Sequence, residues 1–279
     1  MTFRGRLAAV TLEDVRSGRR RLLLALPLAA VLAGCGATAH KAARERPPAA
    51  HQAAGPPRTH EVAVRGCAAG LRPLGSSRIA VAAFVRSSAV AYRRPGARPF
   101  ARFGRLNVNR FPTVFRVLAA VRAHDCKTRW YRVQLPIKPN GVTGYVRAAA
   151  VTTGRVRSRV LVDLSERRLT LFRNGRRALR TTVAVGSSAT PTPTGRYYVN
   201  QRLIPADDSG PFGPAAIGIS AYSTVLTGWT QGGPIAIHGT NEPWSIGHAV
   251  SNGCVRVRND VLRRLFRVTP AGTPVLIRR

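Results

Sequence analysis

Residues 235–256 read Ile235-Ala-Ile-His-Gly-Thr-Asn-Glu-Pro-Trp-Ser-Ile-Gly-His-Ala-Val-Ser-Asn-Gly-Cys-Val-Arg256. The stretch begins with an apolar strand that ends at His238, and it holds one cysteine, Cys254, directly after a glycine. A thiol becomes a nucleophile when a nearby base or cation helps to remove its proton, and imidazole suits this task near neutral pH. The pair indicates a cysteine nucleophile with a histidine base. A buried structural thiol is the alternative.

The residues beside the cysteine also suit acyl transfer. Gly253 permits a tight turn and a close approach of a substrate to the backbone. Backbone N–H groups at that turn could receive the oxyanion of a tetrahedral intermediate. Arg256 shares a strand face with Cys254 if the backbone is extended, and it could then bind a substrate carboxylate.

Three blocks of sequence follow one another in the order and spacing of a known family. They are Val162-Asp-Leu-Ser, then Val183-Ala-Val-Gly186 with Thr190-Pro-Thr-Pro-Thr-Gly-Arg-Tyr-Tyr-Val199, then His238-Gly239-Thr240 with Ser251-Asn252-Gly253-Cys254-Val255-Arg256. In order and spacing they resemble the L,D-transpeptidase (YkuD-type) catalytic domain, and the resemblance covers about residues 158–279.

The resemblance implies a β-sandwich in which Cys254 is the nucleophile and His238 the general base. It implies the amides of Gly253 and Cys254 as oxyanion donors, and the Gly239 carbonyl as the group that orients the imidazole. The substrate-binding positions that it implies are Ser251, Asn252 and Arg256. It implies neither a metal nor an organic cofactor.

The implied reaction cross-links peptidoglycan stem peptides. The cysteine attacks a donor tetrapeptide between diaminopimelate and D-alanine, D-alanine leaves, and the acyl group passes to the side-chain amine of an acceptor diaminopimelate. The product is a 3→3 link, although some family members attach an envelope lipoprotein to the wall instead. Carbapenems acylate the same cysteine. An L,D-carboxypeptidase and a catalytically inactive wall-binding lipoprotein remain open as alternatives.

One position departs from the family pattern. Many members have histidine where this chain has Asn252. Asparagine donates and accepts hydrogen bonds but does not titrate. That histidine is usually not the assigned base, so the departure need not abolish activity. His248 is expected in a surface loop, and Trp244 is expected either to line the loop over the site or to pack against the domain.

The N-terminus has the pattern of an export signal. A charged region ends in Arg19-Arg20-Arg21, and the uncharged run Leu22–Gly34 follows it. This run is short for a membrane span. Leu32-Ala33-Gly34-Cys35 resembles the lipobox of bacterial lipoproteins, which implies a lipid on Cys35 and a membrane anchor facing the cell wall. The alternative is an ordinary signal peptide or an uncleaved anchor. Either places the rest of the chain outside the cytoplasm.

Two further segments are predicted between the signal peptide, residues 1–34, and the catalytic domain. Residues 35–60 are rich in Pro and Ala, which is typical of a spacer. Residues 61–155 hold short apolar runs separated by turn residues, which predict a small β domain. Within it, Trp130–Arg147 loosely resembles the last strands of a bacterial SH3-like barrel, with Trp130 and Tyr145 expected in the barrel core rather than on a ligand platform.

The chain is therefore expected to be mostly β. A strand pattern is read at each of the following ranges: 79–85, 113–121, 130–135, 144–146, 159–164, 169–173, 179–185, 217–220, 234–238 and 274–277. Asn174-Gly175 is a hairpin signal. One helix is predicted over 259–266, where four apolar side chains share a face.

The remaining cysteines form a candidate pair. Cys35 and Cys254 have other predicted roles, which leaves Cys67 and Cys126. An oxidising exterior permits a disulfide between them, worth about 2–4 kcal/mol. Two buried free thiols are the alternative. No C-x-x-C pair exists, which disfavours a zinc ribbon.

The net charge of +34 comes from 45 basic and 11 acidic residues. Such a charge favours an acidic partner. Nucleic acid is disfavoured because the arginines are spread along the whole chain, no nucleic-acid-binding motif appears, and the chain is expected to be exported. A solvated arginine-rich surface, or contact with an anionic envelope polymer or lipid surface, remains.

Overall fold

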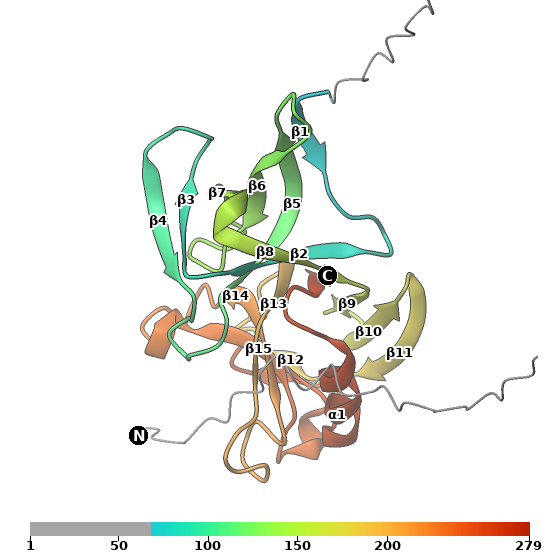
Figure 1. The fold of residues 1–279 in the computed structure, drawn as a ribbon. Coiled ribbons are helices and arrows are strands. Elements are labelled where there is room, and N and C mark those ends of the chain that lie inside the picture. Colours follow the sequence, from blue (N-terminus) through green and yellow to red (C-terminus); the bar gives the residue numbers. More distant parts are fainter. Residues whose placement is uncertain (1–67) are drawn as a thin grey trace, which may run out of the picture. The chain divides into compact units, whose positions relative to one another are not determined.

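The computed structural model describes residues 68–279, and about half of them lie in β-strands, which Figure 1 draws as arrows. The predicted signal peptide and spacer, with the lipidation site Cys35, lie outside the described residues, and so does Cys67. Cys126 is disulfide-bonded. Because Cys67 is not described, its pairing with Cys126 stays a prediction.

The first half of the described chain folds into an antiparallel sheet. Its strand order is β4-β3-β7-β6-β5-β2-β8, and β1 also pairs with β5. The strands are β1 (Gly70–Pro73), β2 (Ala80–Val85), β3 (Ser88–Tyr92), β4 (Pro99–Gly104), β5 (Val114–Arg122), β6 (Thr128–Gln134), β7 (Thr143–Arg147) and β8 (Val151–Val156). The four strands predicted in this region are confirmed as β2, β5, β6 and β7. The SH3-like type of this domain stays a prediction.

The core of this sheet is built by alternate residues of its strands. Phe115, Val133 and Val146 are fully buried and belong to one apolar cluster. Since side chains alternate along a strand, Trp130 and Tyr145 are out of phase with Val133 and Val146. Both aromatics are only half-buried and outside the cluster, so the expectation that they form the core is wrong. On the other face, Trp130 instead meets the Tyr92 ring edge to face, and the Arg147 guanidinium lies over the Trp130 ring.

The second half forms a sheet ordered β11-β10-β9-β18-β13-β14-β15-β17, with β12 and β16 pairing separately. The elements are β9 (Ser158–Asp163), β10 (Arg168–Arg173), β11 (Arg176–Thr182), β12 (Val185–Gly186), β13 (Gly195–Leu203), β14 (Ala216–Tyr222), β15 (Pro234–His238), β16 (Ala249–Ser251), β17 (Val255–Arg256), α1 (Asn259–Val268) and β18 (Pro274–Arg278). The predicted strands and helix in this half are all present, although the strand predicted over 179–185 begins and ends earlier, as β11.

Strand β13 connects two parts of this sheet. Gly195–Tyr198 pair with β18, and the second half of the strand, from Val199, pairs with β14. Strand β13 thus belongs to two leaves of the sheet, one with β18 and one with β14. Apolar side chains from both leaves join in one buried cluster. Helix α1 adds Val261, Leu262 and Leu265 to that cluster from one face, as its apolar spacing requires.

The hairpin predicted at Asn174-Gly175 joins β10 to β11. Both turn residues have positive φ, 51° for Asn174 and 82° for Gly175. These are the angles that a two-residue turn needs to match the twist of its strands, and asparagine and glycine reach them at the lowest cost.

The two sheets belong to one compact unit of the chain. Tyr198 of β13 is fully buried, and its hydroxyl donates to the Val114 carbonyl of β5 over 3.1 Å. Tyr198 and Val114 share an apolar cluster with Ala82 of β2. Gly272, just before β18, has φ +87°, and a Cβ added there would overlap the Cβ of Ala82.

Gly272→Ala is therefore expected to lower the free energy of unfolding by about 2–4 kcal/mol, from backbone strain plus overpacking between the sheets. Urea unfolding measures the loss. Gly96→Ala is the matched control, because Gly96 has φ +78° and nothing within 4 Å of the added Cβ. It should cost about 1 kcal/mol from strain alone. Equal losses would show that the contact with Ala82 does not limit this position.

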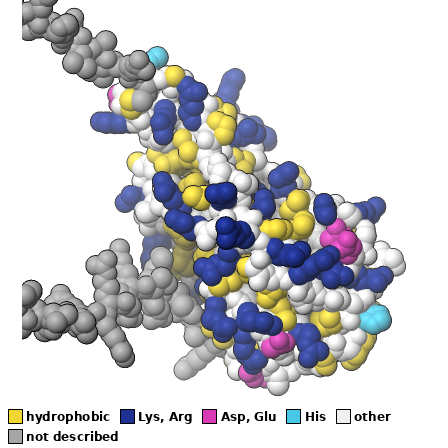
Figure 2. Space-filling model, turned by 90° about the vertical axis from the view of Figure 1, so that its right-hand side faces the viewer, with side chains coloured by type: hydrophobic (Ala, Val, Ile, Leu, Met, Phe, Trp, Pro, Cys, Tyr) yellow, Lys and Arg dark blue, Asp and Glu magenta, His cyan; other side chains and the backbone are white. Residues whose placement is uncertain are grey.

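On the face that Figure 2 draws, basic side chains do not form a single stripe. Figure 2 shows Lys and Arg spread over the whole face in view, with few acidic side chains among them. Within the described residues, no helix has both the length and the apolar character needed to cross a membrane. The same residues contain no cluster of three His, Cys, Asp or Glu side chains suited to a metal ion.

Candidate active site

His238 and Cys254 come from neighbouring parallel segments. In the pairing of β15 with β17, Ile237 lies opposite Val255 and His238 opposite Arg256. Ile237 and Val255 belong to the buried core, so alternation turns His238 and Arg256 to the other face of the sheet. Cys254 directly precedes β17, and the Ala236 amide donates to its sulfur over 3.4 Å. The register thus brings the predicted nucleophile and base to one face.

The imidazole of His238 is fixed by its own backbone neighbour. Its Nδ1 lies 2.6 Å from the Gly239 carbonyl oxygen. A carbonyl only accepts, so Nδ1 carries the proton and Nε2 keeps a lone pair. The ring of Phe212 meets the imidazole edge to face at 4.9 Å between centroids, and His238 is only 5% exposed. This environment holds the tautomer that a general base needs.

Burial disfavours the charged forms of both the His238 imidazole and the Cys254 thiol. The pKa of His238 is lowered to about 4, mainly by burial; the hydrogen bond to the Gly239 carbonyl opposes this shift, and the Arg256 charge adds to it. Burial raises the pKa of the Cys254 thiol, although the Ala236 N–H and the Arg256 charge pull it down. At neutral pH the resting site therefore holds a neutral thiol and a neutral imidazole, and not a preformed thiolate.

The Ser251 hydroxyl stabilises the turn before the cysteine. Ser251 is 2% exposed, and its Oγ donates to the Cys254 carbonyl over 2.6 Å. The Gly253 amide donates to the same Oγ over 3.2 Å. The expectation that Gly253 supplies an oxyanion donor and Ser251 binds substrate does not fit this geometry, because both groups are engaged within the turn. Among the described residues the Cys254 amide has no acceptor, so it is the donor that remains for an oxyanion.

The segment around Thr190 stabilises this turn through hydrogen bonds. The Ser251 carbonyl accepts from the Thr190 hydroxyl at 2.9 Å and from the Ser187 amide at 3.0 Å. Gly186 packs so closely on the chain at Thr190 that an added Cβ would overlap backbone atoms there. Two sequence blocks about sixty residues apart therefore meet at the cysteine.

Arg256 is paired with a residue that the sequence did not single out. Its Nη1 forms an ion pair and hydrogen bond with Glu242 Oε2. The Arg256 side chain is 18% exposed, and its buried Nε has no partner among the described residues. The predicted role in binding a substrate carboxylate is thus limited to the edge of the guanidinium that Glu242 leaves open. Glu242 lies within the 235–256 stretch, where its charge was the available signal.

A comparison with protein families finds a match over the part of the chain that holds this site. Residues 157–277 match the family described as the YkuD L,D-transpeptidase catalytic domain. This part of the chain is similar to the YkuD L,D-transpeptidase catalytic domain. The matched range begins at the residue before β9 and ends within β18, so it contains His238, Cys254 and their supporting residues.

Two curated relatives show how far the likeness extends. The putative L,D-transpeptidase YkuD of Bacillus subtilis is 39% identical over 120 residues, which are 43% of this chain and 65% of the relative. The probable L,D-transpeptidase ErfK/SrfK of Escherichia coli K12 is 38% identical over 94 residues, 32% of this chain and 26% of the relative. The chain thus spans less than two thirds of the length of these relatives.

Two solved structures show a likeness with low overall agreement. A mutant of Enterococcus faecium L,D-transpeptidase aligns with a TM-score of 0.33 and 24% identity, over 43% of this chain and 49% of that one. L,D-transpeptidase 3 of Mycobacterium tuberculosis aligns with a TM-score of 0.36 and 15% identity, over 51% of this chain and 76% of that one.

Three further residues of the YkuD-like part of the chain lie at its surface. Asn252, which stands where many family members have histidine, is exposed next to the turn. His248 is exposed, as expected for a surface loop. Trp244 is 65% exposed in the loop between β15 and β16, so it does not pack into the domain. Phe212, which touches the imidazole, was not anticipated, because it lies far from the motif in sequence.

The pH dependence of stability tests the environment of His238. Its pKa is lowered from 6.5 to about 4, so unfolding takes up a proton between these pH values and stability falls as the pH drops through this window. We expect the native protein to lose about 2–3 kcal/mol more than His238→Gln between pH 7 and 4.5 in urea unfolding. His248→Gln is the control and should behave like the native protein. Parallel pH profiles for all three would contradict the burial of a neutral imidazole.

Proposed function

We propose that this chain is a peptidoglycan L,D-transpeptidase that works through an acyl-enzyme on Cys254. The observation that carries the proposal is the placement of Cys254 and His238 on one sheet face of a YkuD-like domain, with the tautomer of His238 fixed by the Gly239 carbonyl. The relatives named as L,D-transpeptidases support the reaction class. We further propose that the substrates are the tetrapeptide donor and the diaminopimelate acceptor.

In the first half-reaction, the sulfur of Cys254 attacks the amide carbonyl carbon while its proton passes to Nε2 of His238. The carbonyl oxygen becomes an oxyanion, which the Cys254 amide can receive. The C–N bond then breaks, and the imidazolium returns its proton to the nitrogen of the leaving D-alanine. A thioester on Cys254 remains. The neutral resting pair suits this sequence, because thiol and imidazole become charged only as the bond forms.

In the second half-reaction, the acceptor amine attacks the thioester carbonyl. His238 takes a proton from the attacking nitrogen and gives it to the departing sulfur, which restores the thiol. The low pKa of His238 keeps the imidazole unprotonated at neutral pH, so it is ready for both steps. If water replaced the amine, the same site would act as an L,D-carboxypeptidase.

We also propose that the protein works outside the cytoplasm, anchored to the membrane by a lipid on Cys35. The lipobox-like sequence Leu32-Ala33-Gly34-Cys35 supports this location. The substrate supports it as well, since mature stem peptides lie outside the membrane. Carbapenems are the expected inhibitors, because they present a strained amide to the thiol.

Product analysis separates the two reactions. With a tetrapeptide donor and a diaminopimelate-containing acceptor, we expect mass spectrometry to detect a cross-linked dimer and one released D-alanine per link. The dimer should disappear when the acceptor amine is acetylated. If the shortened tripeptide formed at the same rate with both acceptors and no dimer appeared, the enzyme would be a carboxypeptidase. If no D-alanine were released under either condition, the inactive wall-binding alternative would hold.

A further inference from the structure

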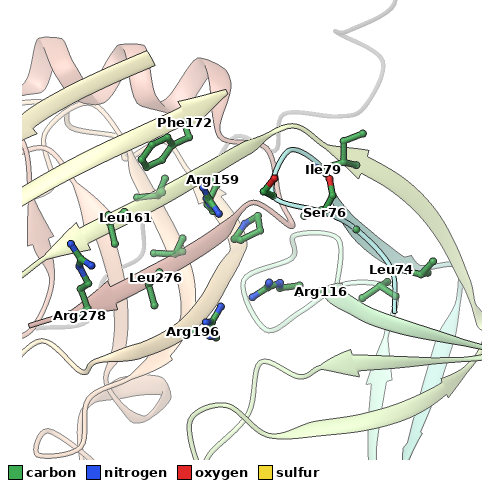
Figure 3. Close-up of a pocket in the computed structure, with 17 residues that line it drawn as sticks. Leu74, Ser76, Ile79, Arg116, Arg159, Leu161, Phe172, Arg196, Leu276 and Arg278 are labelled. Carbon is green, nitrogen blue, oxygen red and sulfur yellow. Dashed lines mark hydrogen bonds between the residues drawn. The ribbon is translucent and has the colours of Figure 1, made fainter. Parts of the chain in front are cut away.

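A cavity lies away from the cysteine, between the two sheets. Its volume is about 430 Å³. The loop before β2, with Leu74, Ser76 and Ile79, forms one side, and strands β9, β10 and β18 form another (Figure 3). Neither Cys254 nor His238 lines it, so the proposed chemistry gives this cavity no role.

The cavity collects positive charge without matching negative charge. Four arginines line it and no aspartate or glutamate does; they are Arg116, Arg159, Arg196 and Arg278. Arg278 is paired with Asp163 at 3.1 Å, and Arg159 stacks over the Phe172 ring at 5.1 Å. Arg116 and Arg196 have no acidic partner among the described residues.

Arg116 and Arg196 are also close enough to repel each other. The pKa of Arg116 is lowered by burial and, next, by the positive charge of Arg196. A partly buried guanidinium beside a like charge is costly unless an anion compensates it. The arginine-rich surface elsewhere does not explain this site, since an exposed arginine is fully hydrated, whereas Arg116 is partly buried in the cavity wall.

The rest of the lining is apolar and offers hydroxyl groups at one edge. Phe172, Leu161 and Leu276 form the wall on the β9–β10–β18 side (Figure 3). Ser76 Oγ accepts from the amides of Arg78 and Ile79, which leaves its O–H free to donate. Guanidinium groups bind carboxylate and phosphate oxygens in two-point contacts. The cavity therefore combines anion-binding groups with an apolar wall.

We propose that this cavity binds an anionic ligand. Its phosphate or carboxylate lies between Arg116 and Arg196, and its apolar part packs against Phe172. The inference is independent of the reaction at Cys254.

The test measures binding of three small probes by calorimetric titration at constant ionic strength. Phenyl phosphate and benzoate carry the two candidate anionic groups on one apolar ring, and benzamide is the neutral match for benzoate. We expect saturable one-to-one binding of at least one anionic probe and none of benzamide. The stronger of the two anions then assigns the natural ligand as a phosphate or a carboxylate.

Two double variants locate the site. Arg116→Gln/Arg196→Gln is expected to weaken anion binding at least tenfold. Arg94→Gln/Arg98→Gln removes the same charge from exposed positions outside the cavity and should change it less than twofold. If the cavity variant fails to fold, Arg196→Gln alone, an exposed side chain, should still weaken binding at least threefold. Equal weakening in both double variants, unsaturable binding, or equal binding of benzamide would overturn the proposal.

Discussion

Cys254→Ser should lower the rate of transpeptidation by at least about 10⁴-fold, because loss of a nucleophile that works with its base removes most of the catalysis. A hydroxyl is far less acidic than a thiol. The neutral His238, with a pKa of about 4, is too weak a base to remove its proton at a useful rate. Serine is close in size to cysteine, so the turn held by Ser251 should persist. Steady-state release of D-alanine measures the effect.

Two controls separate a loss of the nucleophile from a loss of the fold. The thermal unfolding midpoint of Cys254→Ser should stay close to that of the native protein, and His248→Gln, at an exposed position of the same segment, should keep nearly full activity. A serine variant within tenfold of the native rate would mean that the nucleophile lies elsewhere.

His238→Gln should slow acylation by about 10²–10⁴-fold, the usual contribution of a general base. The loss should appear in kcat more than in KM, because the imidazole acts on the proton of Cys254 and not on the bound peptide. The native rate should also decline as the pH falls through about 4, where His238 takes up a proton and can no longer act as a base. The variant should lack this acid limb.

The matched variant is again His248→Gln, which changes the same residue type on the surface. Stopped-flow acylation by a carbapenem gives the rate without the acceptor step. If His238→Gln and His248→Gln acylated equally fast, the assignment of His238 as the base would have to be given up.

The strands could be predicted where local sequence has a clear period or turn signal. Strand β15 has the predicted bounds 234–238, and the Asn174-Gly175 turn lies where the hairpin signal placed it. Strands β1, β3, β4 and β8 of the first sheet were missed, and so were β12, β13, β16 and β17 of the second half. They are short or weakly apolar, and most of them pair with a strand that does not neighbour them in sequence. The division of β13 between two leaves also depends on tertiary contacts and leaves no local pattern.

The candidate site was predicted as residue types but not as a hydrogen-bond network. The motif gave Cys254 and His238, and the pairing of β15 with β17 places them on one face. The pairing of Arg256 with Glu242 and the use of the Gly253 amide by Ser251 depend on side-chain conformations that sequence spacing does not define. The neutral state of the thiol and imidazole likewise follows from burial, which only the folded chain provides.

The proposed acyl-enzyme can be observed directly by intact-protein mass spectrometry after incubation of the folded protein with a carbapenem. We expect a mass increase of one carbapenem per chain, since opening of the lactam ring loses no atoms. Peptide mapping should place it on Cys254, and Cys254→Ala should not form it. A folded protein that forms no adduct, or that carries it on another residue, would contradict a cysteine acyl-enzyme at this site.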